Sequence, residues 1–204
     1  MKTIFWLILG ILLLITLLVW YRSLDNNFQA IISTESKVEP PAFHLPVFPI
    51  YLQNDPRWKD NKIGGSQETL GAVGCTVCCV SMALAHHGIH WLPNQLNELL
   101  KTHDGYTQQG WLKWYTLSKI TDNQITFYIP NKPSLAVIDA ALNAGEPVVA
   151  KILLYDVVYH WVLIVGKAGK EYLVKDPLGD GQSLDKLSKF KSKIYAIRVV
   201  KKNG

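Results

Sequence analysis

The hydrophobic residues of this chain follow three different patterns. An uncharged run covers residues 4 to 21 and is long enough to cross a bilayer as a helix. Apolar residues at helical spacing follow between residues 70 and 143, and short runs rich in Val, Ile, Leu and Tyr follow residue 147. We therefore expect an α+β domain, with a helical half packed on a C-terminal antiparallel sheet, preceded by one transmembrane helix.

The uncharged N-terminal run is flanked by Lys2 and Arg22, and no Ala-x-Ala-like cleavage site follows it. We interpret residues 1–22 as an uncleaved signal anchor, with a cleaved signal peptide as the alternative. Basic residues lie on both sides of the run, so the positive-inside rule hardly decides the orientation. Because a single N-terminal anchor usually exports the domain behind it, we expect a single-pass cell-membrane protein with an extracytoplasmic domain.

Behind the anchor the chain is first polar and then proline-rich. Pro40, Pro41, Pro46 and Pro49 favour extended backbone. We therefore predict an extended linker over residues 23–47 and a globular domain over residues 48–204.

The stretch between Gly74 and Gly88 contains neither Gly nor Pro and is apolar nearly all round. This pattern predicts a buried helix that begins near Cys75, with Gly71 and Gly74 breaking any structure before it and Gly88 at its end. A thiol in the first turn of a helix feels the positive end of the helix dipole, which favours the thiolate. A cysteine packed in the core is the alternative, and this stretch alone does not decide between them.

The other elements follow from caps, breakers and alternation. Pro93 suits the first position of a helix, and Ser134 is an N-cap for a helix that stops before Gly145. We expect further helices over residues 94–102, 111–120 and 135–143, and strands over residues 125–129, 147–154, 159–166, 171–176 and 194–200.

A hairpin is predicted where the second and third of the late strands meet. If the loop is Lys167, Ala168 and Gly169, with the glycine in the left-handed conformation, counting back places His160 directly opposite Asp176. An imidazole and a carboxylate in that position can share a hydrogen bond. The alternative is a satisfied core histidine together with an aspartate that merely opens a turn.

Together these residues supply the parts of papain-type nucleophilic catalysis. Cys75 would be the nucleophile, His160 the base and Asp176 the residue that orients the imidazole. The backbone N–H of Cys75 and one side-chain amide would form the oxyanion hole, for which Gln53 is the candidate. An ordinary surface glutamine is the alternative for Gln53.

The same residues resemble a family. The segments Gln53-Asn54-Asp55-Pro56-Arg57-Trp58, Gly74-Cys75, His160-Trp161 and Asp176-Pro177 occur in the order seen in the peptidase family thirty-nine-like cysteine peptidases. This is the bacterial group around the bacteriocin-processing, double-glycine peptidases, and its fold is papain-like. The resemblance covers residues 48 to 200. It implies Cys75 as nucleophile, His160 as base, Asp176 as orienting acid and Gln53 as oxyanion donor.

The chain also departs from the bacteriocin-leader peptidases. Their glutamine stands a few residues before the cysteine, whereas Gln53 stands much further upstream of Cys75, as in the broader group. No ATP-binding cassette follows in this chain, so leader cleavage coupled to export is not supported within it. Cys78 and Cys79 are unusual beside a nucleophile, and we expect them to pack inside the helix.

Three other functions remain open at the level of sequence. Cys75 and Cys78 form a Cys-x-x-Cys spacing, as in thiol redox proteins, although no strand feeds directly into the helix. The cysteines could bind zinc together with His86, His87 or His90, but structural zinc usually takes two such pairs. A catalytically silent, membrane-tethered peptide-binding module would have the same residues.

Composition narrows the choice of partners. The net charge is +5 and the basic residues are scattered, so we expect no nucleic-acid partner. Three cysteines within five positions make no disulfide framework. We expect a peptide or protein substrate and no cofactor or metal, and the sequence leaves the oligomeric state open. Aromatic residues could line a substrate cleft or fill the core: Tyr106, Trp111, Trp114 and Tyr115. Candidate substrates are small peptides, peptide leaders or cell-wall cross-bridges near the membrane.

Overall fold

The computed structural model describes residues 16, 19, 22, 42–46 and 49–203. The chain divides into two compact units, Met1–Pro40 and Pro41–Gly204. The membrane helix predicted over residues 1–22 and the linker predicted over residues 23–47 lie mostly outside the described residues. Among the residues that are described, no helix is both long enough and apolar enough to span a bilayer.

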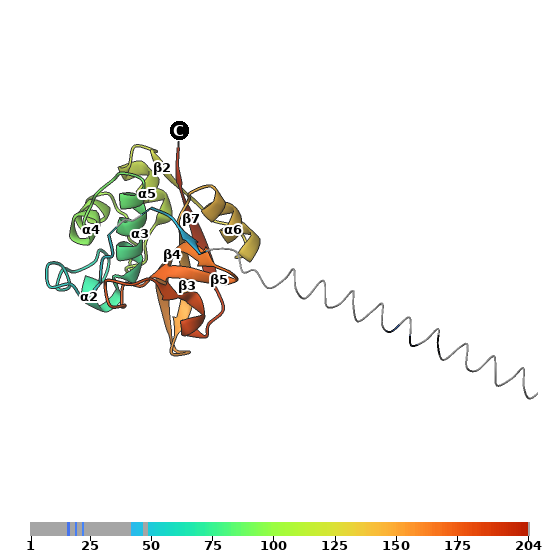
Figure 1. The fold of residues 1–204 in the computed structure, drawn as a ribbon. Helices are drawn as coiled ribbons and strands as arrows, with labels where there is room; N and C mark the ends of the chain where they lie inside the picture. The colour runs from blue at the N-terminus through green and yellow to red at the C-terminus, as the bar shows by residue number, and fades with distance from the viewer. Residues whose placement is uncertain (1–15, 17–18, 20–21, 23–41, 47–48, 204) are drawn as a thin grey trace, which may run out of the picture. The chain divides into compact units, whose positions relative to one another are not determined.

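The second unit mixes helices with an antiparallel sheet, as predicted (Figure 1). Its elements are β1 (Phe43–His44), α2 (Leu70–Val73), α3 (Cys75–His86), α4 (Pro93–Thr102), α5 (Trp114–Ile120), β2 (Ile125–Tyr128), α6 (Leu135–Asn143), β3 (Val148–Leu154), β4 (Val158–Ala168), β5 (Glu171–Lys175), β6 (Asp185–Lys186), the 3-10 helix η1 (Leu187–Phe190) and β7 (Ala196–Lys202).

The sheet has the strand order β2-β7-β3-β4-β5-β6, and β1 pairs with the far end of β4. All of these pairings are antiparallel. Helices α3, α4 and α5 lie on one side of the sheet and α6 lies on the other (Figure 1). Because β4 is covered on both faces, its middle is apolar at every position from Val162 to Val165.

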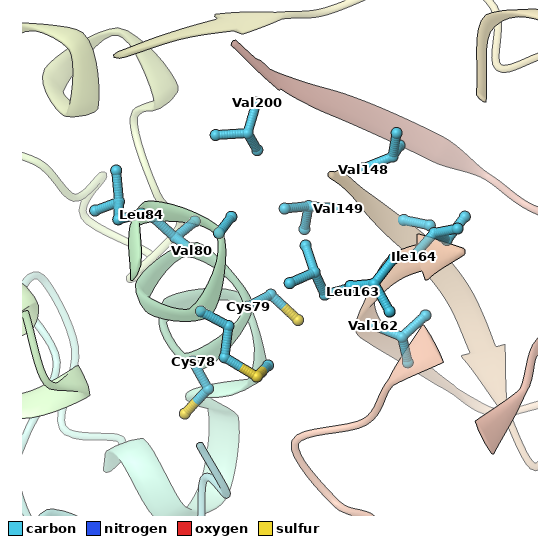
Figure 2. Packing of buried hydrophobic residues seen from close by; sticks show 14 of the residues in the cluster. Cys78, Cys79, Val80, Leu84, Val148, Val149, Val162, Leu163, Ile164 and Val200 are labelled. Atoms are coloured by element: carbon cyan, nitrogen blue, oxygen red, sulfur yellow. The ribbon is translucent and has the colours of Figure 1, made fainter. Parts of the chain in front are cut away.

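The hydrophobic core includes the space between α3 and the middle of the sheet. Figure 2 shows Cys79 of α3 pointing toward Leu163, beside Val149 and Val200 of the neighbouring strands, whereas Leu84 lies on the side of the helix away from them. All five side chains are fully buried. A helix that is apolar nearly all round therefore serves as the central support of the domain.

Helix α3 begins at Cys75, as the sequence predicts, but the expectation for the residues before it is wrong. Gly71 and Gly74 do not break the structure, because the short helix α2 spans Leu70–Val73 and is capped by the Thr69 hydroxyl. The glycines allow close packing instead. A Cβ on Gly74 would lie 2.3 Å from the Leu70 carbonyl oxygen, so only glycine fits where α2 joins α3.

Helices α4 and α6 agree with the prediction, and the Ser134 hydroxyl caps α6 by accepting a hydrogen bond from the Val137 N–H. The predicted helix over residues 111–120 is too long. Trp111 lies in a loop, because Thr107 and Trp111 bond to each other through both backbone and side chain, and α5 begins only at Trp114.

The predicted register of the β4–β5 hairpin is also wrong. Ala168 faces Glu171, so the turn contains two residues, not three, and Gly169 adopts a positive φ within it. Continued without interruption, the pairing of Gly166 with Leu173 would place His160 and Asp176 on opposite faces of the sheet.

A β-bulge at Val165 shifts the register by one residue and returns His160 and Asp176 to the same face. Beyond the bulge Ile164 faces Val174, and the pairing continued by two residues brings Val162 opposite Asp176. His160 lies on the same face as Val162, two residues away, so it meets Asp176 as a diagonal neighbour. The carbonyl oxygen of Val165 accepts a hydrogen bond from the Leu45 N–H at 2.8 Å, just after β1.

Candidate active site

Cys75 occupies the first position of α3, directly after the N-cap residue Gly74. Backbone N–H groups in the first turn of a helix have no acceptor within the helix, so they are free for a ligand. The side chain of Cys75 is buried in the domain, yet it lines a cleft of about 560 Å³. The thiol is therefore placed at the positive end of a helix and at the wall of a cavity.

His160 of β4 and Asp176, directly after β5, form a buried pair. The Nε2 atom of His160 lies 2.7 Å from Oδ1 of Asp176, and the side chains are 3% and 5% exposed. With Nε2 donating to the carboxylate, the remaining ring nitrogen, Nδ1, is available to a second partner.

The second partner of His160 is the side chain of Cys75. Burial by itself lowers the pKa of His160, but hydrogen bonds to Asp176 and Cys75 outweigh burial and raise it to about 9. The imidazole is thus held between a carboxylate and a thiol. This arrangement favours an imidazolium beside the cysteine at neutral pH.

Asp176 is held as an anion by three groups. Burial opposes its ionisation, but the hydrogen bonds from His160 and from the Leu178 N–H keep its pKa below the usual value. Lys189 of η1 adds a positive charge 3.5 Å from Oδ2, and the same ammonium lies 2.5 Å from Asp185. Sequence reasoning missed Lys189, because the pattern of residues predicts neither β6 nor η1.

Gln53 is only 4% exposed, so it is not a surface side chain. Its Nε2 donates to the Gly71 carbonyl oxygen at 2.8 Å and makes a long contact of 3.5 Å to that of Ala72. Its backbone N–H donates to the Pro177 carbonyl oxygen at 3.0 Å. Gln53 therefore joins the helix before Cys75 to the turn after Asp176, while its Oε1 has no hydrogen-bond partner among the described residues.

Cys78 and Cys79 are fully buried, and burial raises the pKa of both thiols well above the ordinary value. The Cys79 thiol donates to the Trp161 carbonyl oxygen at 3.3 Å. Both side chains pack in the core around the interior turns of α3, as expected. A buried thiol with a raised pKa is a poor partner for thiol exchange, which counts against the redox function.

His86 and His87 both bond to the backbone. Nε2 of His86 lies 2.8 Å from the Gly145 carbonyl oxygen, and Nε2 of His87 lies 3.0 Å from that of Val200. In the part of the chain that the structure describes, no group of three or more His, Cys, Asp or Glu side chains could hold a metal ion.

The cleft beside Cys75 has aromatic walls. Tyr106, Trp111 and Trp114 line it, whereas Tyr115 is 69% exposed and lies outside the lining. Sequence reasoning missed Tyr159 and Trp161 of β4, which also line the cleft. Tyr159 and Trp161 are two residues apart on a predicted strand, so their side chains point to the same face. That spacing was the available signal for an aromatic surface beside the site.

Comparison with known proteins assigns the chain to a class. The model of the Peptidase_C39 like family matches residues 47–199, and the chain belongs to this family. A solved chain from Bacillus anthracis, provisionally described as a C39-like peptidase, is 16% identical with a TM-score of 0.45, covering 78% of this chain and 100% of its own. The search of the curated proteins gave no match.

Proposed function

We propose that this protein is a membrane-anchored cysteine peptidase that hydrolyses peptide or isopeptide bonds. Membership of a peptidase family supports hydrolysis in general. The observation that supports the particular site is the buried hydrogen bond of 2.7 Å between His160 and Asp176, with the Cys75 side chain bonded to the same ring. These contacts support the proposal that Cys75 is the nucleophile, His160 the base and Asp176 the orienting acid.

In this mechanism His160 accepts the proton of the Cys75 thiol, and the sulfur attacks the carbonyl carbon of the substrate. The resulting tetrahedral intermediate collapses to a thioester while the imidazolium of His160 donates its proton to the leaving amine. Water then attacks the thioester, His160 accepts a proton from it, and the acid product leaves as the thiol re-forms. Asp176 keeps the ring oriented and stabilises the imidazolium throughout.

The oxyanion of the tetrahedral intermediate needs hydrogen-bond donors that are already in place. The backbone N–H of Cys75 is one, because it lies at the start of α3. Gln53 supplies the second in this proposal. Its Nε2 carries two hydrogens and, among the described residues, makes one short bond, to the Gly71 carbonyl oxygen, and one long contact, to that of Ala72, so a second hydrogen is available to the oxyanion.

An active-site probe that alkylates thiols tests the proposal. We expect labelling of Cys75 in the full-length wild type, no labelling in Cys75→Ala, and a rate lower by roughly 100-fold or more in His160→Ala, since the base would be lost. Equal labelling of wild type and His160→Ala would instead support a catalytically silent peptide-binding module.

The membrane anchor and the extracytoplasmic location are part of the same proposal. They rest on the uncharged run over residues 4 to 21. Protease added to intact cells should remove the domain and leave the anchor in the membrane. A domain that stays protected until the cells are lysed would show that the orientation is wrong.

A further inference from the structure

The cleft that contains Cys75 is lined mainly by large apolar side chains. Five aromatic residues contribute to it, together with Ile63, Val73, Val77 and Leu112. The aromatic residues are Tyr106, Trp111, Trp114, Tyr159 and Trp161. Its volume of about 560 Å³ far exceeds what a glycine needs beside the nucleophile.

One wall presents an exposed tryptophan on an ordered loop. Trp111 is 70% exposed. Its carbonyl oxygen accepts a hydrogen bond from the Thr107 N–H at 2.8 Å, and its own N–H donates to the Thr107 hydroxyl at 3.1 Å. The flanking residues Tyr106 and Leu112 pair as an isolated β-bridge. A large apolar side chain held at a cleft by a tightly bonded loop, without being buried, is accessible to a ligand in that cleft.

A second wall of the cleft is built by Tyr159 and Trp161 of β4 and by Lys151 of the neighbouring strand β3. The rings of Trp161 and Trp114 have centroids 5.5 Å apart, which joins this wall to α5. Tyr159, 53% exposed, extends the wall toward solvent. The ammonium of Lys151 lies 3.8 Å from the centroid of the Tyr159 ring. Tyr159 and Trp161 alternate with His160 along β4, so their side chains point to the other face of the strand, and the cleft reaches the proposed site through Cys75.

Charge does not set the preference of the cleft. Glu68 and Lys151 are the charged side chains of its lining, and they have opposite signs. Apolar surface is therefore the property that distinguishes one substrate side chain from another. Full burial of a Leu or Phe side chain stabilises a complex by about 1.5–3 kcal/mol, which corresponds to roughly 10- to 100-fold in affinity.

We propose that the substrate is a peptide with a large aliphatic or aromatic side chain next to the scissile bond, held between Trp111 and the wall formed by Tyr159 and Trp161. This inference rests on the proposed peptidase function. On this inference the cleft binds a bulky apolar side chain of the substrate, and the enzyme is not restricted to substrates with glycine at that position.

The test uses the full-length protein and internally quenched peptides in which a single Phe, Leu, Asp or Gly stands in an otherwise constant sequence of Ala and Ser. We expect kcat/KM for the Phe and Leu peptides to exceed that for the Gly peptide by roughly 10-fold or more. Mass spectrometry should place the cut within two residues of the Phe or Leu.

Trp111→Ala and Tyr115→Ala are the matched variants, because both rings are exposed but only Trp111 lines the cleft. Trp111→Ala should reduce the ratio of Phe to Gly cleavage several-fold, whereas Tyr115→Ala should preserve it. Cys75-dependent cleavage with equal rates for Phe, Asp and Gly would overturn this inference and leave the peptidase function standing. If no peptide is cleaved and Cys75 does not react with the probe, both fall together.

Discussion

Two cysteines one helical turn apart have opposite surroundings. Cys75 lies at the first position of α3, lines the cleft and bonds to His160, whereas Cys79 is fully buried and bonds to the Trp161 carbonyl oxygen. Burial raises the pKa of the Cys79 thiol. The comparison teaches that the same side chain on the same helix becomes a candidate nucleophile or a core residue according to its position along the helix axis.

The sharpest way to break this comparison is to replace each cysteine by alanine. Cys75→Ala should abolish peptide hydrolysis, with a loss on the order of 10⁴-fold or more, because the nucleophile is removed. Cys79→Ala should retain activity and lower the free energy of unfolding by about 1 kcal/mol, since a small buried group is lost. Steady-state kinetics and urea unfolding measure the two effects. Loss of activity in a folded Cys79→Ala protein would contradict the assignment.

Asp176→Asn should have the next largest effect. The amide can occupy the same space but does not stabilise the imidazolium of His160, so kcat should fall by roughly 10²- to 10⁴-fold. The KM should change little, because Asp176 does not line the cleft. Hydrolysis of the preferred peptide gives both constants. A variant with unchanged kcat would show that the buried pair serves only the stability of the sheet.

The pH dependence of stability tests the environment of His160 by itself. Its pKa is about 9 in the folded protein against an ordinary value of 6.5. A raised pKa means that the folded state binds the proton more tightly, so the stabilisation is fully present below pH 6.5 and is lost as the pH rises toward 9. The midpoint of urea unfolding should therefore fall over this window in wild type.

The matched control for that window is His160→Gln, which removes the titrating ring. Its unfolding midpoint should change less between pH 6.5 and 9 than that of wild type. Since Cys75 contributes to the raised pKa of His160, Cys75→Ala should lower that pKa, and the loss of stability should then end at a lower pH than in wild type. Identical pH profiles for wild type and His160→Gln would contradict the assigned ionisation.

The smallest effect is expected for Lys189→Met. Lys189 lies between the carboxylates of Asp176 and Asp185, at 3.5 Å and 2.5 Å, so its loss leaves two like charges facing each other. The pKa of Asp176 should rise, and kcat should fall several-fold with the acid limb of the rate profile moved to higher pH.

Asp185→Asn in the Lys189→Met background should reverse part of that shift, because it removes the second carboxylate, and Lys189→Arg should behave like wild type. Kinetics between pH 4 and 8 would measure both. An acid limb that stays in place in Lys189→Met would show that Lys189 contributes only to surface packing.

The elements near strong local signals were predictable. Ser134 and Gly145 delimit α6, and the first residue of α3 is the predicted Cys75, because caps and breakers act within a few residues. The expected helix from residue 111 was wrong for the opposite reason. Hydrogen bonds between Thr107 and Trp111 hold that segment as a loop, and the periodicity of apolar residues does not reveal them.

The hairpin register shows the same limit at the candidate site. The sequence led to contact between His160 and Asp176, and the contact exists, but through a two-residue turn and a bulge at Val165 that were not expected. The shorter turn shifts the register by one residue and the bulge shifts it back, so His160 and Asp176 lie on the same face of the sheet, as predicted. A bulge is decided by both neighbouring strands and by the Leu45 N–H that bonds to Val165, and none of these is local in sequence.

By itself, the sequence determined the α+β order and the central buried helix, and it predicted a candidate nucleophile, base and orienting acid, because periodicity, caps and residue chemistry are local properties. Only the tertiary structure decided the diagonal contact of His160 with Asp176, the place of Lys189 behind the carboxylate and the aromatic walls of the cleft. These depend on segments distant in the chain, and their pairing is determined by packing of the whole core.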